Sequence, residues 1–271
     1  MRLQHTLGRT PYYVFGGGLA VIFLFPLVWT VVASVSPHPA TAQQVGVGLG
    51  NYRTLMNYDS GLPTYLWNST YVSILTVVFT LVLSVLGGYA FARFRFPGRD
   101  AIFLVIVGLL VVPIQLALIP LARLFGELGL FGTIPGVILF HAGFGLPFAI
   151  FLLRNFFAAI PRDLLEAARM DGGRELTIFR RVILPLGGPA IASLAIFQFL
   201  WVWNDLLVAL IFADPTVAPL TAAIQRQTRN FGQNVDVIAP GAFLQMLVPL
   251  LVFFAFQRYF IEGISASGVK E

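Results

Sequence analysis

The sequence of 271 residues carries few charges and no thiol. Only 11% of its residues are charged, whereas an ordinary soluble domain has about 25%. Cysteine is absent, which excludes disulfides, thiolate metal sites and cysteine nucleophiles and leaves the redox compartment undetermined. The three histidines, His5, His38 and His141, are far apart in the sequence, so a metal site is not expected. Because so few charges cannot cover a water-soluble globule of this size, we expect lipid to solvate much of the chain.

Lysine is almost absent, and this excludes a nucleotide-binding loop. A phosphate-binding P-loop is glycine-rich and ends in Lys followed by Ser or Thr. The single lysine, Lys270, stands between Val269 and Glu271, so this sequence contains no such loop. We therefore expect a chain that is not an enzyme and binds no cofactor of its own. The sequence also lacks runs of like charge and low-complexity tracts, so nucleic acid is not an expected partner.

Long apolar runs are what the sequence does contain. Hydrophobic residues make up 58% of the chain, and a helix across a bilayer core of about 30 Å needs about 20 of them in succession. Lipid offers no hydrogen-bond partner to the backbone, so each such run must be helical. Six runs qualify: Tyr13–Val35, Tyr71–Ala92, Ala101–Ala122, Leu128–Leu153, Pro185–Leu207 and Val237–Phe256. The sequence predicts an all-α integral membrane protein with six transmembrane helices.

The first run could also belong to a signal peptide, because Ala40-Thr41-Ala42 resembles a cleavage site. The apolar core of a signal peptide has about 7–15 residues, and Tyr13–Val35 is longer. We therefore expect a retained first helix.

The basic residues predict the orientation. If the segments between spans alternate sides, 13 of the 17 basic residues fall on the side of the N-terminus, which the positive-inside rule assigns to the cytoplasm. Both termini are then cytoplasmic. The predicted parts are an N-terminus (1–12), a first helix (13–35), an extracytoplasmic loop (36–66), a five-helix core (67–260) and a cytoplasmic tail (261–271). The core includes a cytoplasmic segment (154–184) and an extracytoplasmic loop (213–239).

The cytoplasmic segment 154–184 is large enough to hold structure of its own. Pro161 suits a first helical position, Asp163 complements the helix dipole, and Gly172-Gly173 supplies a stop. A second amphipathic stretch leads into Leu184-Pro185. One interpretation is a helix pair lying on the membrane. The other is an element that docks a cytoplasmic partner.

The spacing of residues in this segment resembles a known loop. Glu166-Ala167-Ala168, Gly172 and Leu184-Pro185 follow the pattern of the "EAA" loop of binding-protein-dependent ABC importer permeases, with Val182 where that pattern usually has Ile. The similarity runs from about Asn51 to the C-terminus and indicates the carbohydrate branch, of maltose/glycerol-phosphate type. It is carried by Tyr89–Phe94, Phe96–Gly98, Pro113 to Pro120, Trp203-Asn204-Asp205, Gln257–Phe260 and Val269-Lys270. Relatives tend to end in Gly after that Val-Lys, where this chain has Glu271.

This resemblance implies a type I ABC importer permease fold in a bacterial or archaeal cytoplasmic (inner) membrane. The implied partners are a second homologous permease, two ATPase subunits that hold ATP and Mg²⁺, and an extracytoplasmic solute-binding protein. The implied substrate is a sugar, such as the disaccharides trehalose or maltose, with glycerol phosphate or another solute as the alternative. The residues implied to couple to the ATPase are Glu166, Ala167, Ala168, Arg169, Met170, Asp171, Gly172, Gly173, Leu184 and Pro185.

Polar side chains within membrane spans are costly and are candidates for the translocation path. Sugars are typically held by amide and carboxylate groups and by aromatic faces, so Trp201, which lies near Gln198 and Asn204, is also a candidate. The candidates are Gln115, His141, Gln198, Trp201, Asn204, Asp205 and Gln245.

Two of these candidates have competing interpretations. If the fifth helix starts between Pro185 and Pro189, Asp205 lies about 24–30 Å above its cytoplasmic end. Asp205 could then act in structure or gating, contact the solute, or lie at the lipid interface. His141 could form an interhelical hydrogen bond or contact the solute. In the outer loop, Arg226 and Arg229 either dock the binding protein or are simply solvated.

Two other functional classes remain open from the residues alone. An ion-driven secondary transporter would use Asp205 as its proton or sodium site. A non-transporting membrane scaffold would use the inner segment to bind some other partner.

Overall fold

The computed structural model describes residues 10–37, 47–228 and 234–268, and the secondary structure in these ranges is helical apart from an isolated β-bridge between Gly132 and Ala213. The chain divides into two compact units. One unit combines Met1–Pro63 with Ile224–Leu247, and the other combines Thr64–Ala223 with Val248–Glu271. The predicted all-α fold class is confirmed.

The first unit contains α2 (Thr10–Val35), α3 (Gly50–Asn57), the end of α12 (Leu220–Thr228) and the first part of α13 (Val235–Gly268). The side chain of Asn51 in α3 donates to the backbone oxygen of Ser36 (2.9 Å), just beyond α2. The hydroxyl of Tyr58 donates to Gln227 Oε1 at 2.7 Å. The predicted outer loops therefore contain short helices whose ends are fixed by side-chain hydrogen bonds.

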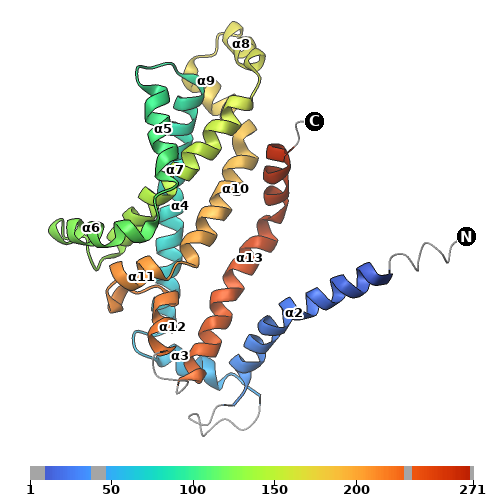
Figure 1. The fold of residues 1–271 in the computed structure, drawn as a ribbon, viewed down its shortest axis with the longest axis vertical. Helices are drawn as coiled ribbons and strands as arrows, with labels where there is room; N and C mark the ends of the chain where they lie inside the picture. Colours follow the sequence, from blue (N-terminus) through green and yellow to red (C-terminus); the bar gives the residue numbers. More distant parts are fainter. Residues whose placement is uncertain (1–9, 38–46, 229–233, 269–271) are drawn as a thin grey trace, which may run out of the picture. The chain divides into compact units, whose positions relative to one another are not determined.

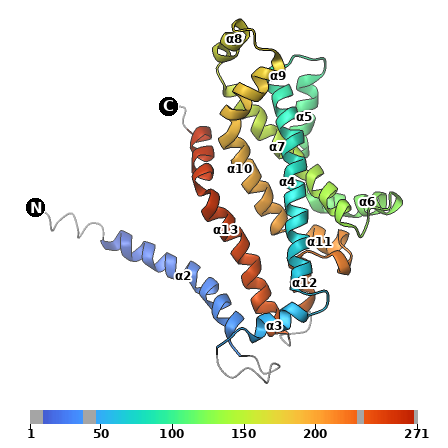
Figure 2. The same ribbon diagram turned by 180° about the vertical axis from the view of Figure 1, so that it is seen from behind.

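The second unit is built on three long helices, α4 (Leu62–Arg93), α7 (Ile134–Ala159) and α10 (Leu184–Trp203). Figures 1 and 2 show α8 and α9 at one end of these helices and α11 at the other. Gly88 allows α4 to approach α7 closely, because a Cβ at this position would lie 2.9 Å from Leu153 Cβ. Such small residues are typical of packed membrane helices.

Each end of the second unit has its own buried apolar cluster. Near α8 the cluster includes Leu153, Phe157, Leu165 and Ile183. Near α11 it includes Val137, Phe140, Val208 and Phe212. The functional candidates at the two ends therefore rest on separate packed cores.

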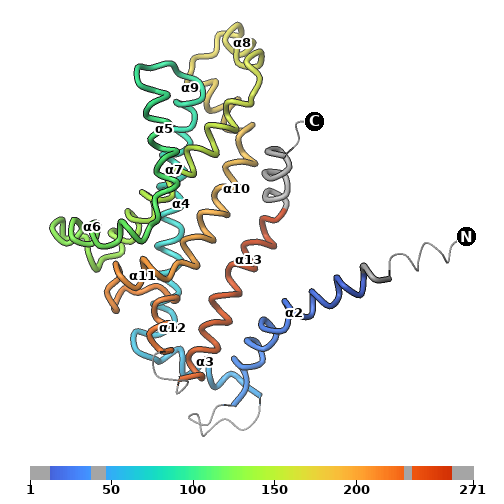
Figure 3. The backbone as a smooth tube through the Cα atoms, in the orientation of Figure 1, coloured from blue at the N-terminus to red at the C-terminus, as the bar shows by residue number. Residues whose placement is uncertain are grey.

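The predicted third span, Ala101–Ala122, differs from the structure. It is divided into α5 (Arg99–Leu109) and α6 (Ile114–Glu127), which are bent by 101° relative to each other (Figure 3). Pro113 stands between them in an extended conformation, and proline disfavours a helical conformation in the residue before it. The prediction of one continuous helix is therefore wrong, and the described residues hold up to six spans when this bent pair counts as one broken span.

The five other predicted spans correspond to helices that are long and apolar enough to cross a membrane. The fifth begins earlier than expected. After α8 (Arg162–Met170), α9 (Glu175–Ile178) continues through a π-helix, η1 (Phe179–Ile183), into α10. It also ends earlier, at Trp203 instead of Leu207. The chain then resumes with α11 (Leu207–Phe212) and the 3₁₀ turn η2 (Pro215–Val217).

Candidate functional site

The first candidate site is the 160–183 segment between α7 and α10, and α8 is its central element. Pro161 is extended and lies at the N-cap, one residue before the first helical residue, Arg162, and not at the first helical position that the sequence suggested. At the other end, Gly172 has φ +79°, and Gly173 N–H donates to Ala168 O at 3.0 Å. This is a glycine helix stop of the kind the sequence predicted.

The two glycines serve the stop in different ways. Gly172 needs the left-handed conformation, and its missing Cβ would face open space. Gly173 needs room, because a Cβ there would lie 2.6 Å from the carbonyl oxygen of Ala168. Both requirements exclude most side chains from these positions.

One face of α8 is buried and the rest is open. Leu165 is 4% exposed and belongs to the apolar cluster at this end. Met170 is 88% exposed, and Leu164 is exposed as well. Glu166, Ala167, Arg169, Asp171 and Gly172 are also exposed, Ala168 and Gly173 are half-buried, and Leu184 and Pro185 are the first two residues of α10. The helix therefore presents a mixed apolar and charged surface while one leucine anchors it.

Three residues to which sequence reasoning gave no role fix this segment to α4. Glu175 Oε1 lies 2.9 Å from Arg169 Nη2 of α8, and Glu175 Oε2 accepts from the hydroxyl of Tyr89 in α4 at 3.3 Å. Arg93, the last residue of α4, donates to the backbone oxygens of Phe157 and Ile160. Their residue types and positions were readable in the sequence, but the helices that they contact were not.

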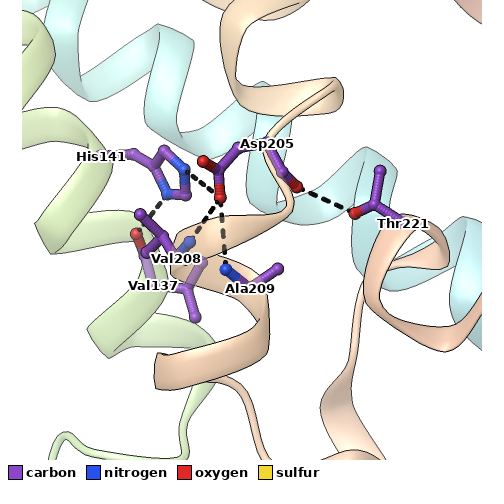
Figure 4. Close-up of polar contacts among 6 residues, drawn as sticks. All are labelled: Val137, His141, Asp205, Val208, Ala209 and Thr221. Carbon is purple, nitrogen blue, oxygen red and sulfur yellow. Dashed lines mark hydrogen bonds and ion pairs between the residues drawn. The ribbon is translucent and has the colours of Figure 1, made fainter. Parts of the chain in front are cut away.

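The second candidate site is the break between α10 and α11, shown in Figure 4. The side chain of Asn204 donates to Leu200 O at 2.7 Å, which satisfies a carbonyl near the end of α10. Asp205 Oδ2 accepts from the backbone N–H groups of Val208 (2.9 Å) and Ala209 (3.2 Å) and caps the start of α11. The polar Asn-Asp pair thus ends one helix and begins the next.

His141 of α7 faces the same carboxylate (Figure 4). Its Nδ1 lies 2.9 Å from Val137 O, which can only accept, so Nδ1 carries a hydrogen. Its Nε2 lies 3.4 Å from Asp205 Oδ2, and the side chains of His141 and Asp205 are 1% and 12% exposed. The contact is an ion pair when Nε2 is protonated as well.

The surroundings of this pair are closed. The Thr221 hydroxyl donates to Asp205 O at 2.9 Å, and the backbone N–H of Leu220 donates to Ser69 Oγ at 2.8 Å. The cavity beside the pair, lined among others by Ser69 and Ser73, has a volume of about 10 Å³. That is room for about one water molecule, whereas pockets for small molecules measure about 300–1,000 Å³.

Two further path candidates, Gln198 and Trp201, contact α7. The rings of Trp201 and His141 are 5.3 Å apart in an edge-to-face arrangement. Gln198 is buried against Gly145, where a Cβ would lie 2.7 Å from Gln198 Oε1. Both contacts join α10 to α7, so these side chains help to pack the two helices.

The remaining predicted path and docking residues are not part of this arrangement. Gln115 is exposed on α6, beyond the bend, and Asn204 points its amide back to its own helix. Gln245 and Arg226 belong to the other compact unit, and Arg229 lies outside the described residues. Within the described ranges, no three His, Asp or Glu residues gather as a metal site would require.

A row of buried hydroxyls on α4 was not predicted. The residues recur every three or four positions, so they share one face of the helix. They are Ser69, Ser73, Thr76, Thr80 and Ser84, all buried. Their spacing was readable in the sequence, but small hydroxyl residues in an apolar run carry a weak signal.

Comparisons with known proteins agree with this architecture. A family described as "Binding-protein-dependent transport system inner membrane component" matches residues 84–265. The "Osmoprotective compounds uptake permease protein GgtD" of Synechocystis sp. is 48% identical over 224 residues, which are 82% of this chain and 75% of the relative. The "Alpha-glucoside transport system permease protein AglG" of Rhizobium meliloti is 44% identical over 82% of this chain and 60% of the relative.

The fold is also found in a solved structure. A chain of a bacterial ABC transporter involved in the import of the acidic polysaccharide alginate matches with a TM-score of 0.81 at 23% identity, covering 96% of this chain and 98% of that one. The resemblance to ABC importer permeases and the type I permease fold are thereby confirmed. The chain belongs to the family of binding-protein-dependent transport system inner membrane components, the multi-pass permeases of ABC importers.

Proposed function

We propose that this chain is the permease subunit of an ATP-driven importer of α-glucosidic disaccharides or short oligosaccharides, such as trehalose or maltose. Both of these sugars are α-glucosides, the class named for the permease AglG. Glycerol phosphate and osmoprotective solutes are the alternatives, and GgtD is named for the latter. The sister permease and the binding protein would share in setting this specificity.

The observation that carries the proposal is α8, a short helix that is anchored on one side and open on the other. Its open surface around Glu166, Met170 and Gly172 would fit a cleft on an ATPase subunit. The ATPase pair would hold ATP and Mg²⁺ and would drive α8 as a rigid body. This chain would supply no catalytic group to hydrolysis.

The arrangement in the membrane follows from the basic residues. The 160–183 segment and both termini would face the cytoplasm of a bacterium or archaeon, because 13 of the 17 basic residues fall on the side of the N-terminus when the bent pair α5–α6 counts as one span. A second homologous permease would complete the path. The binding protein would dock on the opposite side, with Arg226 and Arg229 among its contacts.

The small cavity at the α10–α11 break favours a gating role for Asp205 and His141 over direct sugar contact. A disaccharide needs far more space than about 10 Å³, so the pair would hold this region closed. Alternating access would open it when α8 moves. An ion-driven transporter with Asp205 as its ion site predicts instead that uptake continues without nucleotide.

The docking proposal is tested with Glu166→Lys in the assembled transporter. Reversing this exposed charge on α8 should weaken retention of the ATPase subunits, or ATP-driven maltose and trehalose uptake, by about tenfold or more. The matched control is Glu127→Lys, the same change at an exposed position at the end of α6. Equal retention and equal uptake in Glu166→Lys and wild type would contradict the docking role.

A further inference from the structure

We propose that Arg93 and Tyr89 are positioning residues that transmit the movement of α8 to α4, and that α4 carries this movement to the α10–α11 break. This inference rests on the proposed docking of an ATPase subunit at α8. It assigns the connection between motor and membrane path to one helix and to two of its side chains.

Arg93 holds the point where the chain leaves α7 for α8. The backbone oxygens of Phe157 and Ile160, which accept from its guanidinium, belong to the last turn of α7 and to the residue after it. The last four carbonyls of a helix have no partner within the helix, and a positive charge there is favoured by the helix dipole. The half-buried Arg93 therefore acts as a charged cap that α4 supplies to α7.

Tyr89 holds the point where the chain returns from α8. Its hydroxyl donates to Glu175, the first residue of α9, and the same carboxylate binds Arg169 near the end of α8. Residues four apart lie on the same face of a helix, so Tyr89 and Arg93 project from adjacent turns of α4. Both ends of the 160–183 segment are thus held by two side chains on adjacent turns of α4.

Close packing makes this connection stiff. The Tyr89 ring lies 4.9 Å from that of Phe179 in η1 and 6.3 Å from that of Phe157 in α7. One residue earlier, Gly88 brings the backbones of α4 and α7 together at Leu153. Interfaces packed in this way move as blocks rather than deforming continuously, so α4 must follow a displacement of α8.

The far part of α4 reaches the closed region. Ser69 lies about 36 Å from Arg93 along the helix axis, and Ser69 and Ser73 line the cavity that also contains His141 and Asp205. Asn68 donates to Ala218 O at 3.3 Å, and Ser69 accepts from the backbone N–H of Leu220. One unbroken helix therefore contacts the 160–183 segment at one end and the surroundings of the His141–Asp205 pair at the other.

The test uses the complete transporter in proteoliposomes and measures ATP hydrolysed per molecule of labelled maltose or trehalose imported. Arg93→Gln should retain the ATPase subunits but raise this ratio about tenfold, within the range of coupling free energies between sites. Arg93→Lys keeps the charge and should restore most of the coupling. Tyr89→Phe removes a single oxygen and should raise the ratio about threefold.

The matched control is Arg95→Gln, the same substitution at an exposed arginine two residues away. An unchanged ratio in Arg93→Gln, or an equal rise in Arg95→Gln, overturns the inference. If Arg93→Gln fails to assemble, Tyr89→Phe decides, and a wild-type ratio in that variant overturns the inference. Loss of the proposed function has a different signature, because wild-type import would then not depend on ATP and Glu166→Lys would behave as wild type.

Discussion

Each end of the second compact unit brings a basic side chain close to a carboxylate, in opposite surroundings. At the α8 end, Arg169 and Glu175 lie 2.9 Å apart with side chains 52% and 48% exposed. At the α10–α11 break, His141 and Asp205 lie 3.4 Å apart with side chains 1% and 12% exposed. An exposed ion pair contributes little to stability, whereas the loss of a buried acceptor costs the desolvation of the donors left without a partner.

The end of α8 and the start of α11 show the same contrast between exposed and buried surroundings. The stop of α8 is made by backbone groups and two glycines, and the start of α11 is made by a carboxylate that also faces His141. The first end depends on no side-chain acceptor. The second is fixed by one residue with several simultaneous roles, so perturbations there should be larger.

The largest effect is expected for Asp205→Ala. It removes the acceptor of the backbone N–H groups of Val208 and Ala209, which caps α11, and the carboxylate beside His141, so the free energy of unfolding should fall by about 3 kcal/mol. Chemical denaturation in detergent micelles measures this change. The control is Asp214→Ala, because Asp214 also accepts from a backbone N–H, that of Thr216, but is exposed; its loss should be about 1 kcal/mol. Equal losses in the two variants would remove the contrast between the two ends.

An intermediate effect is expected for Gly173→Ala in the helix stop. The added Cβ would meet Ala168 O at 2.6 Å, so the free energy of local opening of α8 should fall by about 2 kcal/mol. Gly172→Ala has open space and only the strain of φ +79°, which should amount to about 1 kcal/mol. Amide hydrogen exchange of residues 163–173 measures both, and the reverse order would show that strain outweighs crowding.

The smallest effect is expected for Arg169→Gln. Because the Arg169–Glu175 pair is half exposed, its removal should change the local opening free energy by less than about 1 kcal/mol. The difference from wild type should shrink further at 1 M salt, where the Debye length is about 3 Å. Hydrogen exchange at two salt concentrations measures this. A large, salt-independent effect would mean that the pair behaves like the buried one.

The helices and the motif at α8 could be predicted because both depend on local sequence. Apolar runs of span length have to be helical in lipid, and the stop at Gly172-Gly173 needs only neighbouring residues. Pro113 in the sequence indicated a possible break, but the run Ala101–Ala122 was long and apolar enough to be interpreted as one span. Asn204 and Asp205 are ordinary helix-ending and helix-starting residues, and their position within an apolar run made them candidates for the translocation path.

The connections of Arg93, Tyr89 and Glu175 could not be predicted in the same way. Each depends on which helices lie side by side, and no local pattern fixes that. The distribution of basic residues predicts that Arg93 lies on the cytoplasmic side, but it does not predict which backbone oxygens Arg93 contacts. The pairing of His141 with Asp205, 64 positions apart, was beyond reach for the same reason.

The π-helix η1 determines how far α10 is rotated about its axis relative to α9. Ile178 and Ile183 are both buried although they are five residues apart, a spacing that one wide turn accommodates and an α-helix does not. Relative to a regular helix, η1 holds one surplus residue, and one residue corresponds to a turn of about 100° about the axis. If η1 tightened into a regular turn, α10 would have to rotate against α9 without any change in its length. The fold therefore contains, between α8 and α10, one wide turn that fixes which face of α10 is directed toward α7.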